Sequence, residues 1–299
     1  MAEYSRILVV RGGAIGDFVL TMPVFSALKE TYPEASIGCL SPSGYGELVT
    51  SVELANAWEN LDDRVWASFF VSNGDLDDEM AKWVSQFDLI VSFLYDPEEA
   101  WVNNIRRICS ARFIQGCARP SDSGNQPATI TLLSVLEEIG IRGADPLPRI
   151  TIDTNGSDCY DLAVHPGSGS ESKNWPIENW IELLSIWLDR NSGNLLVLGG
   201  EAEEKKMTQL KEIIDSCRVN FALNRSLVSV ASSLSNSRFF LGHDSGITHL
   251  AAALGVPALV LWGPSNRCVW SPQHKHVRLM ALNEGGIVVS PSTVLDQIG

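Results

Sequence analysis

Short apolar runs alternate with helical stripes along most of this chain. Each apolar run ends in a turn rich in glycine, serine or aspartate, and a stretch with apolar residues three or four positions apart follows. A short apolar run bounded by turn residues indicates a buried strand, and the spacing of three and four indicates an amphipathic helix. Strand and helix in alternation predict parallel sheets covered by helices.

In the first half, the pattern predicts strands at Arg6–Val10, Ala35–Leu40, Leu89–Leu94 and Arg112–Gly116. It predicts helices at Phe18–Lys29, Glu47–Trp58 and Thr129–Ile139. Pro23 lies within the first helical stripe, so we expect either a kink there or a helix that starts late and is capped by Thr21.

The amino-acid composition changes at Asp145–Asp161, where prolines, glycine and short polar residues indicate a linker. A second series follows, with strands predicted at Leu162–Val164, Leu195–Leu198 and Ala258–Leu261 and helices at Ala202–Ile214, Leu227–Leu234 and Ser292–Ile298. The length fits two ordinary domains or one large α/β domain. We predict two Rossmann-like domains, residues 1–150 and 151–299, with a cleft between them.

The stretch Phe239–Pro264 is the most informative part of the chain. An apolar run leads into the polar turn GHDSG, an alanine-rich helix follows, and the chain returns as another apolar run. This order predicts a loop at the carboxyl end of a strand and the amino end of a helix, where unpaired N–H groups favour an anion such as phosphate. Asp244, Ser245 and His249 follow one another closely here, whereas a purely structural turn would need only Asn, Asp or Gly.

The glycine-rich loop RGGAIGD follows the first strand and contains Gly12 and Gly13. Its spacing differs from the G-x-G-x-x-G of dinucleotide-binding proteins, and the second strand ends in Ser41-Pro42 where a ribose-binding carboxylate would be expected. NAD binding is therefore disfavoured. Asp17 fits two interpretations: an acidic residue favoured in a first helical turn, or a general base.

Two further loops combine glycine with charge. HPGSGSESKNWP offers the backbone and hydroxyls around Ser168 and Gly169, and Lys173 adds a cation suited to phosphate oxygens. LGGEAEE places acidic residues at a helix start, where Glu201 or Glu203 is either a ribose contact or simply a good helix starter.

Composition excludes several classes of function. The net charge of −14 argues against bulk nucleic-acid binding, which needs a basic face. No run reaches the roughly 18 apolar residues that a membrane-spanning helix needs, and six scattered cysteines fit reduced thiols rather than a metal site. We expect a cytoplasmic protein, either free or peripheral on the cytoplasmic face of the inner membrane.

Four stretches, taken in order and spacing, resemble one known family. They are ILVVRGGAIGDFVLTMP, HPGSGSESKNWP, LLVLGGEAEE and FFLGHDSGITHLAAALGVPALVLWGPS. Together they resemble the ADP-heptose:lipopolysaccharide heptosyltransferases of glycosyltransferase family 9. The resemblance covers nearly the whole chain but is weak between residues 45 and 145.

The resemblance implies an α/β protein of the GT-B fold, with two Rossmann-like domains facing across a cleft, and no metal or other cofactor. The implied reaction is inverting transfer of a heptose from an ADP-sugar to a sugar hydroxyl of a glycan or glycolipid acceptor. By matching position, Asp17 would take the acceptor proton. A carboxylate is a weak base for an alcohol, so the proton would leave late, as positive charge develops on the attacking oxygen.

The positions that match the family's donor contacts fall into two groups. For the donor phosphates they are Ser168, Gly169, Asp244, Ser245, Gly246 and His249, with Lys173 as a catalytic residue that holds the diphosphate charge. For the ribose and nucleotide they are Glu203 and Arg225. An aspartate beside a diphosphate is unfavourable unless it orients the loop or meets the sugar, and both alternatives are open for Asp244.

The acceptor half departs from this picture. Residues 1–150 hold 11 Lys and Arg against 21 Asp and Glu, so this half carries −10 of the total charge of −14. An acceptor rich in phosphates would be repelled unless a local cluster compensates; Gly12, Gly13, Arg106 and Arg107 are the candidate acceptor contacts, with Arg112 and Arg119 nearby. A divergent, non-catalytic nucleotide-sugar-binding protein is the alternative function.

Overall fold

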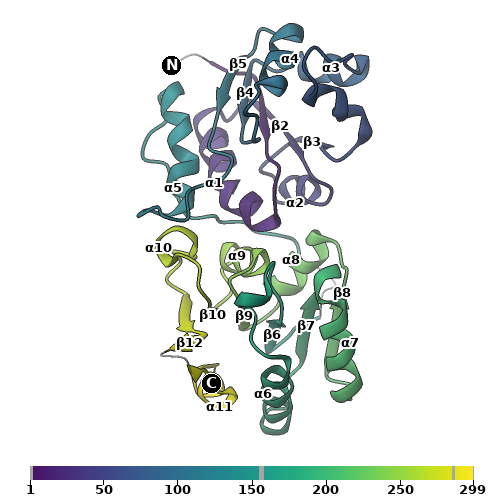
Figure 1. Cartoon of the computed structure of the whole chain (residues 1–299), viewed down its shortest axis with the longest axis vertical. Coiled ribbons are helices and arrows are strands. Elements are labelled where there is room, and N and C mark those ends of the chain that lie inside the picture. Colours follow the sequence, from purple (N-terminus) through teal and green to yellow (C-terminus); the bar gives the residue numbers. More distant parts are fainter. Residues whose placement is uncertain (1–2, 155–157, 285–286, 299) are drawn as a thin grey trace. The chain divides into compact units, whose positions relative to one another are not determined.

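The computed structural model describes residues 3–154, 158–284 and 287–298. It divides into two compact units, Met1–Pro148 and Arg149–Gly299. Each unit contains one parallel sheet with helices on its faces (Figure 1), so the predicted α/β class with two Rossmann-like halves is confirmed. Part of the predicted linker, residues 155–157, lies outside the described residues.

The first unit is a five-stranded parallel sheet in the order β3-β2-β1-β4-β5. Its strands are β1 (Arg6–Val10), β2 (Ser36–Ser41), β3 (Ala57–Asn60), β4 (Leu89–Ser92) and β5 (Arg112–Gln115). Its helices are α1 (Ile15–Thr31), α2 (Tyr45–Ser51), α3 (Asp78–Val84), α4 (Ala100–Ile108) and α5 (Ala128–Leu133), with 3-10 turns η1 (Arg64–Phe70) and η2 (Ser134–Ile139). The central strand β1 is buried along its apolar run, so the loop that follows it starts from a fixed edge.

The second unit has a six-stranded parallel sheet in the order β11-β10-β9-β6-β7-β8. Its strands are β6 (Leu162–His165), β7 (Leu195–Gly199), β8 (Val219–Leu223), β9 (Phe240–His243), β10 (Ala258–Trp262) and β11 (Val277–Ala281); the short β12 (Asn283–Glu284) and β13 (Ile287–Val288) pair separately. Its helices are α6 (Ile177–Arg190), α7 (Glu204–Ile213), α8 (Leu227–Ser235), α9 (Gly246–Ala253), α10 (Arg267–Trp270) and α11 (Pro291–Ile298), with 3-10 turns η3 (Glu171–Lys173) and η4 (Glu201–Glu203).

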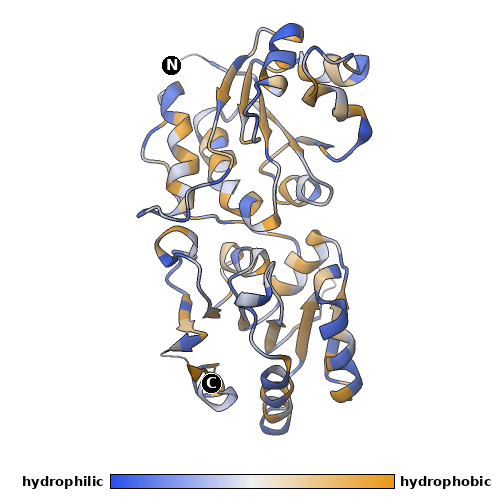
Figure 2. Ribbon diagram, in the orientation of Figure 1, coloured by the Kyte–Doolittle hydropathy of each residue, from blue (hydrophilic) through white to orange (hydrophobic). Residues whose placement is uncertain are grey.

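Burial of hydrophobic side chains stabilises both sheets. Strand residues are mostly hydrophobic, whereas the helices combine hydrophobic and hydrophilic positions (Figure 2). In the second unit a core of Leu, Val and Trp side chains packs strands β6, β7 and β9 against helix α6, with Trp175 and Trp180 almost completely buried. Burying an aromatic side chain removes 150–250 Å² from water, so this core fixes the strand ends from which the polar loops leave.

One local prediction is wrong, and one of two alternatives for another helix is excluded. The predicted helix Glu47–Trp58 ends at Ser51, and Trp58 lies in β3 opposite Cys39 of β2. The Trp58 ring packs against Gly46 so closely that a Cβ there would come within 2.5 Å of it. The predicted helix therefore ran past the end of α2 and into the first two residues of β3.

Helix α1 does not start late. It begins at Ile15 and contains Pro23 in its interior, and Thr21 is buried with its hydroxyl donating to the carbonyl of Asp17 at 2.8 Å. The glycine-rich loop is therefore short, and Asp17 lies in the first turn of the helix.

Candidate functional site

Strands β6 and β9 are neighbours, and their carboxyl ends bring two polar loops together in the second unit. His165 at the end of β6 pairs with Gly242 near the end of β9. The loop after β6 contains Ser168, Gly169 and Lys173, and the turn after β9 contains Asp244. Parallel pairing alone places these loops at one edge of the sheet, the usual position for ligands in open α/β folds.

An ion pair joins the two loops. Lys173 Nζ donates to Asp244 Oδ2 at 2.6 Å, a short charge-assisted hydrogen bond. The Asp244 side chain is only 7% exposed, whereas that of Lys173 is 30% exposed. The buried carboxylate thus holds the ammonium at the surface of the loop cluster. Asp244 was expected either to orient the loop or to meet the sugar. This contact with Lys173 fits the first alternative.

Ser245 begins helix α9 beside this ion pair. Its side chain is the N-cap and accepts from Thr248 N at 3.4 Å, and Gly246 is the first residue of the helix. His249 is 6% exposed within α9. The amino end of a helix carries partial positive charge and unpaired N–H groups, so the start of α9 and the Lys173 ammonium, which Asp244 already pairs, place hydrogen-bond donors in the same loop cluster.

The hydroxyl of Ser168 organises its own loop. Ser168 Oγ lies 2.8 Å from both Ser170 O and Asn174 Oδ1, and it accepts from Ser170 N at 3.3 Å. Ser168 is buried, whereas a Cβ added at Gly169 would meet open space. Within the predicted phosphate loop, the Ser168 side chain therefore stabilises the backbone, and Gly169 leaves its peptide accessible.

His243 was absent from the sequence prediction, yet it holds both ends of this loop. Its Nε2 accepts from the backbone N–H of Trp175 at 2.9 Å, and its Nδ1 lies 3.4 Å from Gly167 O. Since Nε2 accepts, Nδ1 carries the proton. The ring is fully buried, and this burial lowers the pKa of His243 to about 3, so the ring is neutral at physiological pH. The sequence signal for this role was a histidine at the end of the apolar run FFLGH.

Glu203 is placed inside the unit rather than at its surface. It is 6% exposed, its Oε2 accepts from Gly200 N at 2.9 Å, and His165 Nε2 lies 3.7 Å away. Interaction with His165 lowers the pKa of Glu203, against the opposing effect of burial. A Cβ added at Gly167 would come within 2.2 Å of Glu203. The ribose contact remains a prediction, and the exposed Glu201 remains its competitor.

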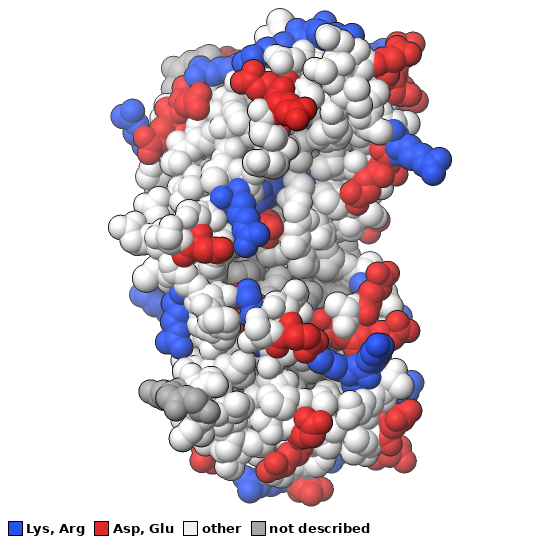
Figure 3. All heavy atoms as spheres, viewed as in Figure 1, with Lys and Arg blue, Asp and Glu red and all other residues white. Residues whose placement is uncertain are grey.

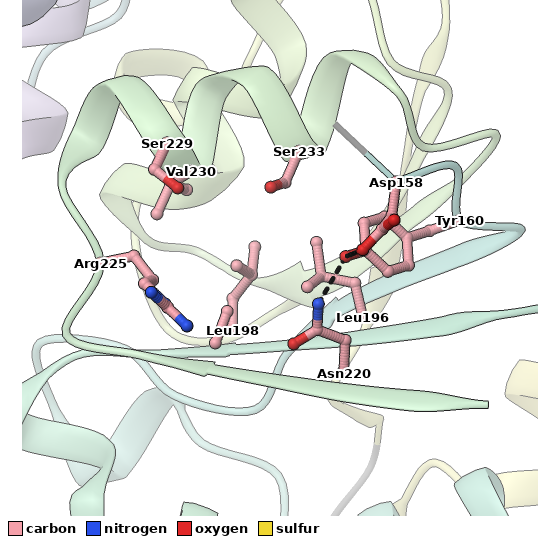
Figure 4. A pocket seen from close by; sticks show the side chains of 10 residues that line it. Asp158, Tyr160, Leu196, Leu198, Asn220, Arg225, Ser229, Val230 and Ser233 are labelled. Carbon is pink, nitrogen blue, oxygen red and sulfur yellow. Dashed lines mark hydrogen bonds between the residues drawn. The ribbon is translucent and has the colours of Figure 1, made fainter. Parts of the chain in front are cut away.

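Arg225 lies at one end of a pocket beneath α8 (Figure 4). The pocket has a volume of about 230 Å³. Its other end carries Tyr160, whose hydroxyl accepts from Asn220 Nδ2 at 2.6 Å and donates to Asp158 at 3.4 Å. Apolar side chains of Leu196, Leu198, Ala222 and Val230 complete the lining with Ser229 and Ser233. The predicted nucleotide contact thus borders an amphipathic pocket in the second unit.

Asp17 lies in the loop-to-helix turn after β1 of the first unit. Its Oδ2 accepts from Ala14 N at 3.2 Å, which is the contact expected of an acidic residue in the first helical turn. Its side chain is 28% exposed, so the carboxylate is also accessible. Gly13 has φ +91°, and a Cβ there would lie 2.9 Å from Asp17 Oδ2. Both interpretations of Asp17 are compatible with this placement, and glycine is required beside it.

The arginines proposed for the acceptor have mixed surroundings. Arg106 and Arg107 are exposed at the end of α4, but Arg107 Nη1 donates to Asn104 Oδ1 at 2.7 Å and to Gly74 O at 3.1 Å. Arg112 donates to the carbonyl of Glu138, and Arg119 pairs with Asp122 at 3.6 Å. On the face displayed in Figure 3, acidic and basic side chains are interspersed. Arg107, Arg112 and Arg119 thus each contact a partner within the first unit.

Among the described residues, no group of three or more His, Cys, Asp or Glu side chains is arranged to hold a metal ion. The six cysteines are all unpaired. Within the same part of the chain, no helix combines the length and hydrophobicity needed to cross a membrane.

Comparisons with known proteins find heptosyltransferases among the similar sequences and solved structures. Residues 145–288 match the family model described as glycosyltransferase family 9 (heptosyltransferase). The chain is 24% identical to lipopolysaccharide heptosyltransferase 1 of Pseudomonas aeruginosa, over 87% of this chain and 79% of that protein. Its fold is similar to a family 9 glycosyltransferase from Veillonella parvula, with a TM-score of 0.78 and 18% identity over 99% and 96% of the two chains. It is also similar to E. coli ADP-heptose LPS heptosyltransferase II, with a TM-score of 0.76 and 18% identity over 98% and 97%.

Proposed function

We propose that this chain is a member of glycosyltransferase family 9, whose model matches residues 145–288, and that it transfers a heptose or related sugar from an ADP-sugar to a sugar hydroxyl. The transfer inverts the anomeric centre and needs no metal ion. The acceptor belongs to lipopolysaccharide or a related surface glycan, as the names of the matched heptosyltransferases suggest.

The observation that carries the proposal is the Lys173–Asp244 ion pair beside the start of α9. The leaving group of the reaction is a nucleoside diphosphate, so the largest electrostatic requirement is to stabilise negative charge on phosphate oxygens. A positioned ammonium, accessible peptides near Gly169 and the helix start at Ser245 supply donors for that charge without a metal.

The other half of the chemistry is removal of the acceptor proton. Asp17 of the first unit is the proposed general base, because its carboxylate is accessible and lies at the carboxyl end of the central strand β1. Attack of the acceptor oxygen on the anomeric carbon forms the new glycosidic bond as the bond to the diphosphate breaks. The acceptor proton passes to the Asp17 carboxylate during that step.

Ligand-induced stabilisation tests the donor class. A ligand present at 100 times its dissociation constant stabilises the folded state by about 2.7 kcal/mol, so we expect ADP and ADP-sugars to raise the unfolding temperature, and UDP-sugars, GDP-sugars and NAD to leave it unchanged. Transfer assayed in EDTA should proceed at the full rate. Strict dependence on a divalent metal would contradict the metal-free mechanism, and ADP binding without turnover on any acceptor would favour a non-catalytic binding protein.

A further inference from the structure

A guanidinium is buried directly behind the carboxylate proposed as the base. Arg11 follows the last residue of β1 and is 1% exposed. Its Nη1 donates to Ala118 O at 2.7 Å and to Phe93 O at 3.3 Å, and its Nε donates to Asp17 O at 3.3 Å. Backbone carbonyls from three segments of the first unit therefore hold the guanidinium plane in one orientation.

The remaining nitrogen of the guanidinium is directed at the Asp17 side chain. Nη2 of Arg11 has no hydrogen bond within the described part of the chain, and it lies 3.5 Å from Asp17 Oδ1. The other oxygen, Oδ2, accepts from Ala14 N at 3.2 Å. The two carboxylate oxygens thus have different partners, a cation on one side and a neutral N–H on the other.

The pairing with Asp17 matters because the Arg11 guanidinium is buried. Desolvation lowers the pKa of Arg11, and the nearby Asp17 charge opposes that effect. A buried cation is unfavourable unless a counter-charge accompanies it, and Asp17 supplies one at a distance longer than a usual charge-assisted hydrogen bond of 2.7–2.9 Å. The two groups are therefore close enough to fix the direction of the Asp17 side chain. Oδ1 of Asp17 is nevertheless left without a short hydrogen bond.

We propose that Arg11 is a positioning residue for Asp17, fixing the direction of the carboxylate that accepts the proton. The proposal rests on the role of Asp17 given under the proposed function. Arg11 itself touches no reacting atom, because its guanidinium is enclosed by the protein. Its effect passes entirely through Asp17.

Kinetics of four variants separate this role from simple structural support. We expect Arg11→Met to lower kcat at least tenfold while the donor KM stays within twofold, because donor binding depends on the second unit. Arg11→Lys should recover part of the loss, since it keeps the charge but lacks the planar fork. In an Asp17→Asn background, Arg11→Met should cause no further loss, because residues that act as a unit are non-additive.

Arg6→Met is the matched control. Arg6 begins the same strand, and its exposed side chain donates to Gln86 Oε1 at 2.5 Å, so this variant should keep the parent kcat. An unchanged kcat in Arg11→Met, or an equal fractional loss in the presence and absence of the Asp17 carboxylate, would overturn the proposal.

Unfolding temperatures provide a readout that needs no activity. If the two side chains are coupled, Arg11→Met and Asp17→Asn should each lower the midpoint, and the double variant should lower it by less than the two decreases combined. Additive decreases would overturn the proposal even if the enzyme is active. A parent protein that turns over no nucleotide sugar would instead reject the proposed function, and the midpoints would still decide whether Arg11 and Asp17 act together.

Discussion

Buried His243 predicts that the second unit loses stability in mild acid. In the folded state the pKa of His243 is about 3, lowered by burial, against a usual value of 6.5. Between these two pH values the unfolded chain binds a proton that the folded state excludes, so acidification favours unfolding. The stabilisation is complete above the unfolded pKa and is lost progressively as the pH falls below it.

The magnitude follows from the size of the shift. One pKa unit corresponds to 1.36 kcal/mol, so the contribution of His243 between pH 7 and pH 5 is about 2 kcal/mol, and across the whole window it is about 5 kcal/mol. Other groups also titrate there, Glu203 among them, whose lowered pKa acts in the same direction. The contribution of His243 is therefore the difference between the parent and a variant that lacks the ring.

His243→Gln is the appropriate variant. A glutamine amide can accept from Trp175 N and donate to Gly167 O, but it does not titrate. We expect the variant to be less stable at pH 7, because the geometry of two buried hydrogen bonds is altered. Between pH 7 and pH 5 its free energy of unfolding in urea should fall about 2 kcal/mol less than that of the parent.

His276→Gln provides the control, since His276 is only partly buried in the same unit and its Nε2 lies 3.1 Å from Ala252 O. Its pH dependence, set beside those of the parent and of His243→Gln, shows how much of the difference is due to the His243 ring alone. Parallel pH dependence in the parent and in His243→Gln would refute the reasoning, because it would mean that the His243 ring does not resist protonation.

Three further substitutions test the site and its support. Lys173→Met should weaken ADP binding about 10- to 100-fold, the equivalent of losing one charge-assisted hydrogen bond of 1.5–3 kcal/mol, measured by titration calorimetry; Lys206→Met, which removes a pair with the exposed Glu171, should change it little. Asp17→Asn should lower kcat by 10²- to 10⁴-fold, as expected for loss of a general base, while ADP binding stays at the parent value; an active variant would exclude Asp17 as the base. Gly167→Ala should lower the free energy of unfolding by about 1–3 kcal/mol, because a Cβ there would lie 2.2 Å from Glu203; unchanged stability in urea would show that the loop yields freely.

Periodicity was sufficient for the fold, but of the edge strands of the two parallel sheets it predicted only β5. Central strands such as β1 and β9 are apolar on both faces, so they appear in the sequence as continuous runs. The edge strand β8, with the sequence VNFAL, has an exposed Asn220 and was not predicted. The edge strand β3 was also missed, and its first two residues were assigned to a predicted helix. An edge strand is buried less, and its pattern is correspondingly weaker.

The site shows a similar division. Lys173 and Asp244 are 71 positions apart, and only the adjacency of β6 and β9 joins them. Sequence identified the two loops but not their ion pair, nor the ring of His243 that ties Trp175 to Gly167. Arg11 was part of a recognised loop, yet its relation to Asp17 depends on carbonyls more than 80 positions away. Long-range hydrogen bonds of this kind have no local signature.

Release of ADP from ADP-heptose is the most direct test of the central claim. The purified protein should be incubated in EDTA with ADP-heptose and a lipopolysaccharide core that lacks heptose, and ADP release should be measured against a reaction without acceptor. We predict release that depends on the acceptor and is abolished in Asp17→Asn. The account would be contradicted if the parent protein neither released ADP nor bound ADP-heptose.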